Sequence, residues 1–462
     1  MEPASSIVPE FLRRHPRQMA LVLGLLAAGL LAACWLVPAE QKAVADQLLG
    51  FPDSHVVSQQ ARPVIMALIC LLPALAALAY LLGDTLDRYI TRRFVAMLGI
   101  CLSAFYAIWL LIDLSDNLSE FQSSKNVLQT TLQYYCARMP AVLLLLLPYA
   151  LLLSLLESLG KLSTYREVIA IIQSGRSVAR MCRPLMLAGI LSTLFAAGIN
   201  YHWAPVAEGS EQDLLELASG KHPAEARKVL YRNLQTQRLW MVSAFPADYE
   251  KGVPLVGVEV TTCNERNQLL ARLSASEASW EPATGKWTFV NPLICHFTNG
   301  AAPVFEKPAS PLVIDAWSET PWQIIKPGLS AQHLGIPDLN AWLDTHEKFP
   351  NMADAAPYLT HWHYRFALPF SCLITVLIAA PLAIHFSRRG AGGGVFLAVL
   401  LSALMMFTNT IILAFGESGH LPPMLTAWLP NALFGLIGIA LLRRRMTGRP
   451  LHQDLRRIFA ST

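Results

Sequence analysis

The chain has 462 residues, of which 54% are hydrophobic and only 15% are charged, and its formal net charge is +4. A composition this apolar predicts an integral membrane protein with a sizeable polar part, and it excludes a disordered chain. The small positive charge does not indicate a nucleic-acid partner, because no stripe of Lys and Arg interleaves with aromatic residues in the polar part.

Eight apolar segments are long enough to cross a bilayer, for which about 20 residues are needed. The first follows basic residues and resembles a signal peptide, but its core is long and no clear cleavage site follows, so we expect a retained span. The first two spans and their loop form an N-terminal extension, residues 1–85, ahead of a block of six. The predicted spans are residues 19–37, 64–82, 94–114, 139–159, 184–203, 366–384, 395–415 and 425–442.

The basic residues between the spans predict the topology. All basic clusters fall on one side of the membrane if both termini are cytoplasmic, as the positive-inside rule requires, and the intervening loops are neutral or acidic. We therefore expect a multi-pass protein with both termini in the cytoplasm. The clusters are Arg13/Arg14/Arg17, Arg88/Arg92/Arg93, residues 160–184, Arg388/Arg389 and Arg443/Arg444/Arg445.

The segment 160–184 has the most informative pattern, with five basic residues and one acid, Glu167. Thr164 and Glu167 have the spacing of a capping box, which predicts a short cytoplasmic helix. Gly175 is suited to end it. An apolar face follows the cap, and such a face on a cytoplasmic helix indicates a docking surface. Glu167 is then either a helix cap or a residue that meets a partner, and the two roles are compatible. The apolar face comprises Val168, Ile169, Ile171 and Ile172.

Residues 204–359 form one long polar stretch, of a size typical for a single domain. Its opening, residues 205–228, has a helical and polar pattern, and residues 334–346 suggest a helix before the chain re-enters the membrane. Alternation of Val256, Val258 and Val260 with polar residues or glycine predicts a strand with one apolar face. We expect a β-sandwich or jelly roll outside the membrane. The predicted strands are residues 228–233, 238–244, 255–262, 269–280 and 286–291.

Several residues of chemical interest have ordinary interpretations. Cys263 and Cys295 lie in the external part, where an oxidising compartment permits a disulfide, although spacing alone does not show that they meet. His361-Trp362-His363 precedes a span, where an interfacial Trp between polar residues is common, so we do not expect a metal site. Glu157 and Asp113 lie near span ends and are expected to be solvated, and Glu417 belongs to an external loop.

The sequence lacks motifs for energy-yielding chemistry. It contains no G-x-x-x-x-G-K-[ST] phosphate loop, no G-x-S-x-G, no H-E-x-x-H and no paired C-x-x-C. We therefore expect no cofactor and no enzymatic activity, and any work done by the protein must be powered by a partner.

Segments spread over residues 86–445 together resemble the LptF/LptG family, the permease subunits of the lipopolysaccharide export transporter. The most specific is Leu421-Pro422-Pro423 followed by Ala427-Trp428-Leu429-Pro430-Asn431, and the G-type subunit is slightly favoured. The other segments are Leu86–Ile90, Ser158–Leu162 with Arg166–Val168 and Ser174-Gly175, Trp203-Ala204-Pro205, Glu319–Trp322, Arg365–Pro369 and Ala380-Pro381-Leu382.

The resemblance implies an α-helical permease core interrupted by a periplasmic β-jelly-roll-like domain. The core would comprise residues 86–204 and 360–446, the inserted domain residues 205–359, and a cytoplasmic tail residues 447–462. It implies four kinds of partner: a cytoplasmic LptB-like ATPase dimer, a second LptF/LptG-type permease, periplasmic LptC/LptA-like bridge proteins, and lipopolysaccharide as substrate. The location implied is the bacterial inner membrane.

The resemblance also implies roles for individual residues. The ATPase would grip a coupling helix at residues 164–175, and a lateral gate would border the lipid cavity on two spans. The coupling residues are Arg166, Glu167, Val168, Ile171, Ser174 and Gly175. The gate residues are Phe105, Trp109, Asp113, Phe396, Leu400 and Phe407.

Two features depart from the family pattern. The extension 1–85 is not part of the six-span unit, and Leu111-Ile112-Asp113-Leu114 stands where some members place a lysine suited to lipid phosphates. Two rival functions also remain. One is a force-transmitting permease that does not move lipid and needs no open apolar groove in its external domain. The other is an enzyme that modifies envelope lipids, which would require clustered His, Asp or Glu at one membrane depth.

Overall fold

The structure is a computed structural model. It describes residues 16–50, 55–122, 126–209, 224–233, 236–246, 253–264, 268–281, 284–297, 302–315, 317, 319–325, 330–346, 352–384 and 392–446. The basic residues Arg13, Arg14, Arg388 and Arg389, the tail 447–462 and most of the predicted helical opening of the polar stretch lie outside these ranges.

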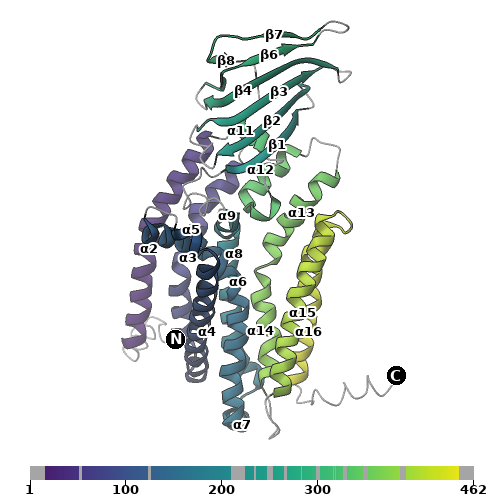
Figure 1. The fold of residues 1–462 in the computed structure, drawn as a ribbon. Helices are drawn as coiled ribbons and strands as arrows, with labels where there is room; N and C mark the ends of the chain where they lie inside the picture. Colours follow the sequence, from purple (N-terminus) through teal and green to yellow (C-terminus); the bar gives the residue numbers. More distant parts are fainter. Residues whose placement is uncertain are drawn as a thin grey trace, which may run out of the picture.

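Long helices run side by side, and a β-sheet lies across one end of the bundle (Figure 1). Within the described residues, seven are long and apolar enough to cross a membrane, and a bent pair supplies an eighth span, which confirms the predicted number. The long helices are α2 (Pro16–Gly50), α3 (Val56–Leu82), α4 (Thr85–Asp116), α6 (Val127–Thr164), α8 (Val178–Tyr201), α13 (Met352–Ala367), α14 (Phe370–Ala383), α15 (Gly392–Glu417) and α16 (Pro423–Met446). The short ones are α5 (Leu118–Gln122), α7 (Glu167–Gln173), α9 (Trp203–Gly209), α11 (Pro321–Ile325), the 3-10 helix η4 (Ala331–His333) and α12 (Ile336–His346).

The predicted span 366–384 is not a single straight helix. The chain breaks at Leu368 and Pro369 and turns by 49° between α13 and α14. Proline lacks the N–H that a continuous helix needs, so the carbonyl groups before it lose their helical partners. The Asn431 side chain of α16 compensates by donating from Nδ2 to the carbonyl oxygen of Ala367 at 2.6 Å.

The centre of the bundle is formed by α6 and α14. Leu151, Leu155 and Leu159 of α6 are fully buried, as are Val376 and Ile378 of α14. Helices α4 and α8 pack against α6, whereas α15 and α16 pack against α14. The extension is the hairpin α2–α3, which lies at the outside of the bundle next to α8 (Figure 1).

The sheet has eight antiparallel strands, which confirms an inserted β domain. Its order is β1-β2-β3-β4-β5-β8, and β6 pairs with β4 and β7. The five predicted strands are present, although β1 begins within the segment expected to be helical, and the three short strands β6, β7 and β8 were not predicted. The strands are β1 (Ala224–Asn233), β2 (Arg238–Pro246), β3 (Leu255–Cys263), β4 (Leu269–Glu281), β5 (Lys286–Val290), β6 (Leu293–His296), β7 (Val304–Glu306) and β8 (Leu312–Ile314).

One face of the sheet is apolar, as predicted, but it is closed. Trp240, Trp287 and Phe289 are fully buried on this face, and Ile324 and Ile325 of α11 pack against it with no exposure. Burial follows the predicted alternation at Val258 and Val260 only. Val256 is half exposed. The backbone of Gly257 has a φ of +63°, which interrupts the regular alternation of side chains between the two faces of the strand.

The two cysteines of the sheet do not pair. Cys263 of β3 is opposite Leu269 of β4, and Cys295 of β6 is opposite Arg272 on the other edge of β4. One strand therefore separates them, which places them about 10 Å apart across the sheet, and their partners on β4 are three residues apart, which adds about 10 Å along the strand. A disulfide needs Cα atoms within about 7 Å. Both thiols are free.

Glu319 anchors the end of the β domain to its beginning. Its carboxylate is completely buried and accepts hydrogen bonds from Asn233 (2.9 Å), Thr236 (2.7 Å) and the Arg238 guanidinium (2.7 Å). Its backbone carbonyl accepts from the Trp287 indole at 2.7 Å. A buried carboxylate needs several donors to offset the cost of its desolvation. The donors around Glu319 therefore fix the position of its backbone relative to β1 and β2.

Candidate coupling site

The short helix α7 lies at the end of the bundle opposite the sheet (Figure 1). The predicted capping box does not form. Thr164 is the last residue of α6, and its hydroxyl donates to the Gly160 carbonyl at 2.9 Å, because α6 continues to this point. Arg166 precedes α7 with a φ of +58° and turns the chain sharply, with no side-chain cap. The prediction failed because the Thr hydroxyl found a partner in the preceding helix.

The predicted end of the helix is confirmed. Gly175 has a φ of +82°, and its N–H donates to Ile172 at 3.0 Å, while the N–H of Arg176 donates to Ile171 at 3.3 Å. This pair of bonds is the Schellman motif, which satisfies carbonyl groups left free at a helix end. The Ser174 hydroxyl donates to the carbonyl of Ile171 at 2.7 Å.

The apolar face of α7 points inward. Val168 has no exposure and belongs to the core of the bundle, and Ile171 packs against the same core. These two side chains were expected to meet a partner, but they hold α7 to its own chain. The outward side presents Tyr165, 68% exposed, and Ile172, 37% exposed. A partner would therefore contact these two residues and the exposed backbone around Arg166.

Glu167 connects α7 to α4. One carboxylate oxygen accepts a hydrogen bond from the Tyr89 hydroxyl at 2.7 Å, and the other pairs with the Arg93 guanidinium at 3.3 Å. Arg93 also donates to the Tyr89 hydroxyl at 3.1 Å. The carboxylate remains 32% exposed. Glu167 is thus an internal tie whose outer side is still open to a partner.

A second connection lies on the other side of α7. Asp84 caps α4 together with Asp87, and it also pairs with Arg180 of α8 and lies 4.0 Å from Arg176, just after α7. Arg180 lies 4.0 Å from Asp87 as well. The segment between α6 and α8 is therefore fastened to the beginning of α4 at both ends.

The coupling site joins parts of the chain that are about 80 residues apart. Tyr89 and Arg93 were not predicted as its members, because the basic residues near the start of α4 were interpreted only as topological signals. The relevant hint was that Leu86–Ile90 and Arg166–Val168 both belong to the family-like segments. Their contact links α7 to α4 through charged hydrogen bonds, which are stronger than neutral ones.

The predicted gate residues are not brought together within one chain. Trp109 of α4 packs edge-on against Tyr135 of α6, with ring centroids 5.9 Å apart, and Phe105 and Asp113 are partly buried on the same helix. Phe396, Leu400 and Phe407 are 68%, 49% and 64% exposed on α15. Figure 1 shows α4 and α15 on separate sides of α6 and α14.

Three other expectations have clear outcomes. Glu157 pairs with Lys161 at 2.5 Å and is 43% exposed, in agreement with the ordinary interpretation. His361 and His363 do not converge: His361 contacts Glu417 at 2.7 Å, whereas His363 lines an apolar groove. Glu417 was expected only to belong to a loop, but it is the last residue of α15, and its contact with His361 joins α15 to α13 at the sheet end of the bundle.

Comparison with known proteins agrees with this arrangement. Residues 88–444 match the family described as lipopolysaccharide export system permease LptF/LptG. The chain is similar to the lipopolysaccharide export system permease protein LptF of Escherichia coli strain K12 and to that of Shigella flexneri. Each is 24% identical over 307 residues, which cover 65% of this chain and 79% of the relative. The preference for the G type is not resolved.

Proposed function

The chain belongs to the LptF/LptG family, the permeases of the lipopolysaccharide export system, and from this membership we propose a specific cycle for it. It extracts lipopolysaccharide, or a similar glycolipid, from the inner membrane and passes it to a periplasmic bridge of LptC/LptA-like proteins. A separate LptB-like ATPase dimer in the cytoplasm supplies the energy. The sheet then lies in the periplasm, and α7 and both termini lie in the cytoplasm.

The contact of α7 with α4 is the observation that carries this proposal. A lipid chain that leaves the bilayer loses about 0.8 kcal/mol for each CH₂ exposed to water, so extraction needs external work. The Glu167–Tyr89–Arg93 contacts and the Asp84–Arg180 pair give that work a route from α7 into a span. The span continues to Trp109, at the level of the proposed lipid cavity.

The gate is formed with a second permease in this proposal. Because α4 and α15 face different sides of one chain, the exposed Phe396, Leu400 and Phe407 need an apolar surface from another subunit or from lipid. Two permeases of the family would place α15 of one beside α4 of the other and enclose a cavity between them.

The closed apolar face of the sheet favours a second candidate, a permease that transmits force without moving lipid. Ile324 and Ile325 cover the face that a lipid conduit would use. We rank this candidate second, because lipid transfer only requires that α11 and Trp317 move away during the cycle.

Co-purification tests the proposal most simply. A tagged chain extracted in detergent should bring along a nucleotide-binding subunit and a second permease, and the complex should release labelled lipopolysaccharide to a bridge protein when ATP is added. Extraction of the chain alone would contradict the whole proposal. A complex that hydrolyses ATP and never releases lipid would favour the force-transmitting candidate.

A further inference from the structure

The hairpin α2–α3 carries a buried polar cluster that the proposed function does not use. Arg62 of α3 is only 5% exposed, and its Nε donates to Oε1 of Glu40 in α2 at 2.7 Å. The same guanidinium donates to the side-chain oxygens of Gln47 at 2.7 Å and Gln59 at 2.9 Å. Charged groups at this depth are costly unless they are paired, so their placement calls for a purpose.

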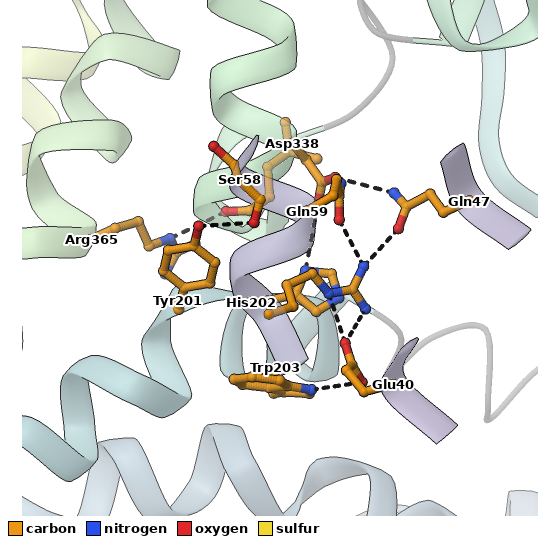
Figure 2. Close-up of polar contacts among 11 residues, drawn as sticks. Glu40, Gln47, Ser58, Gln59, Tyr201, His202, Trp203, Asp338 and Arg365 are labelled. Atoms are coloured by element: carbon orange, nitrogen blue, oxygen red, sulfur yellow. Dashed lines mark hydrogen bonds and ion pairs between the residues drawn. The ribbon is translucent and has the colours of Figure 1, made fainter. Parts of the chain in front are cut away.

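The cluster extends from the hairpin to α12. The amide oxygens of Gln59 and Gln47 accept from Arg62, whereas their amide nitrogens donate to Oδ1 of Asp338 at 3.2 Å and 3.5 Å. Figure 2 shows the contacts of Gln59 and Gln47 with Asp338. Asp338 is itself buried. Burial raises the pKa of Asp338, and the positive charge of Arg62 opposes that shift. Arg62 therefore stabilises a carboxylate on another element through two glutamines that it orients.

Further contacts fix α12 and the end of α8 in the same place. Asn340 donates to the Ser58 hydroxyl at 2.6 Å, and the Tyr201 hydroxyl donates to the Ser58 carbonyl at 3.0 Å. The chain before α12 passes close to α8: a Cβ atom on Gly335 would lie 3.0 Å from the Cα atom of His202. His202 in turn places Nδ1 3.8 Å from Oδ2 of Asp338.

Helix α12 contacts both the sheet and the membrane helices. Ala341 belongs to the hydrophobic core of the sheet, whereas Trp342 stacks on Tyr358 of α13, with ring centroids 3.6 Å apart. Three parts of the molecule therefore meet on this helix: the sheet through Ala341, the permease core through Trp342, and the hairpin through Asp338.

The hairpin is joined to the core mainly through α8, on which α3 packs, and the Trp203 indole donates to Oε2 of Glu40 at 3.4 Å. Below the cluster, an apolar groove of about 900 Å³ separates α3 from α13 and α16. The close approach of α3 to α8 occurs at Gly198, where a Cβ atom would lie 2.6 Å from Ile69. Between the hairpin and α12, the polar cluster supplies the buried charged contact, and the Asn340–Ser58 bond lies beside it. Buried charges tolerate few alternative positions, because any other position leaves a charge unpaired.

We propose that the hairpin α2–α3 is a brace that fixes α12, and with it the sheet, relative to the permease core, with Arg62 and Asp338 as positioning residues. The role of this brace in lipid transfer rests on the proposed function, since the sheet must receive lipid at a fixed place above the cavity. That the hairpin holds α12 and the sheet in place does not depend on the proposed function.

The test measures the position of the sheet directly. Spin labels on unnatural amino acids at Glu277 of β4 and Asp116 at the sheet end of α4, both exposed, report the distance between sheet and core in the full chain in nanodiscs. We expect one narrow distance distribution in the parent protein and a broad one in Arg62→Met and in Asp338→Ala. Asp344→Asn is the matched control, because this residue is on the same helix but its side chain is 62% exposed, and its pair with His55 of α3, at 3.9 Å, is long and solvated, so it contributes little. It should leave the distribution narrow.

Several outcomes decide the proposal. If Arg62→Met does not fold, Asp338→Ala still tests the contact from the α12 side. Where both fold, the double variant should be no broader than either single one, because they act through one chain of contacts. Unchanged distributions in folded variants overturn the brace.

The complete complex then separates the brace from the proposed function. Both variants should lower ATP-driven lipid release about tenfold, within the ordinary range of coupling between distant sites, with ATP hydrolysis retained. Broad distributions with normal lipid release would overturn the positioning role. A parent complex that releases no lipid would refute the proposed function and leave the distance result to decide the geometric claim.

Discussion

Replacement of Glu167 by Gln separates the two roles of this residue, as an internal tie to α4 and as a contact for the ATPase. The amide keeps the shape of the side chain and removes its charge. Tyr89→Phe is the matched variant, because it removes the 2.7 Å hydrogen bond to Glu167 and leaves the carboxylate in place. If Glu167 serves only as a tie, the two variants should behave alike.

The exposure of the two side chains limits how much the contact of Glu167 with α4 can stabilise the protein. Hydrogen bonds to charged groups stabilise by about 1.5–3 kcal/mol, but exposed ion pairs contribute only about 0.2–1 kcal/mol. Glu167 is 32% exposed and Arg93 is 25% exposed, so we expect the tie to be worth about 1 kcal/mol. That is about a fivefold effect on an equilibrium. Loss of a charge pair at a protein interface costs about 2–5 kcal/mol, or about thirtyfold and more.

The assay is ATP-driven lipid release by the complex, together with the thermal unfolding midpoint of the chain in detergent. We expect Tyr89→Phe to lower release by about fivefold at most. Glu167→Gln should lower it by about thirtyfold or more, with an unfolding midpoint close to that of Tyr89→Phe. Equal effects of the two variants on release would refute the role of Glu167 in docking.

Three further experiments test the packing and the electrostatics. Val168→Ala removes buried methyl groups worth about 1.6 kcal/mol from the contact of α7 with the core, and it should lower the unfolding midpoint, whereas Ile172→Ala on the exposed side should not. Glu319→Gln leaves a guanidinium without its buried partner and should destabilise the sheet by about 3 kcal/mol, seen as faster proteolysis; Asp315→Asn, in an exposed pair, should cost less than about 1 kcal/mol. Burial lowers the pKa of His202 to about 3. Below about pH 6.5 the unfolded chain therefore binds a proton that the folded chain does not, so the free energy of unfolding decreases as the pH is lowered. The loss should reach about 1.4 kcal/mol at pH 5.5, and His202→Gln should remove this part of the pH dependence; an unchanged profile would contradict the burial of a neutral imidazole.

Patterns that depend on neighbouring residues were predicted well. Apolar length located the spans, β-like runs between turn residues located the first five strands, and Gly175 marked the end of α7, because each is decided within a few residues. The capping box at Thr164 failed although it is also local, since α6 continued beyond the apolar segment and took the hydroxyl. Pro369 was a visible signal for the bend between α13 and α14 that the apolar length concealed.

Contacts between distant residues could not be predicted in the same way. Glu167 meets Tyr89, and His361 meets Glu417, across 78 and 56 residues, and no periodicity in one chain records such pairs. The brace had a weaker signal. Arg62 is charged and lies two residues before a predicted span, on the side of the membrane where the positive-inside rule expects few basic residues. That exception was a signal, but the sequence does not show which elements bury the side chain, so its burial between α2, α3 and α12 was not foreseen.

The accessibility of α7 tests the central claim that a cytoplasmic engine drives this permease through that helix. The measurement is labelling of Ser174→Cys by a membrane-impermeant thiol reagent in intact spheroplasts, with the exposed Cys34 and Cys136 and the partly exposed Cys70 and Cys263 replaced by serine. Val304→Cys, 59% exposed on β7, serves as the control for the opposite side. We predict that Val304→Cys reacts at once and that Ser174→Cys reacts only after the membrane is opened. Reaction of Ser174→Cys in intact spheroplasts would place α7 on the periplasmic side of the membrane, where a cytoplasmic ATPase cannot bind it, and would contradict the mechanism.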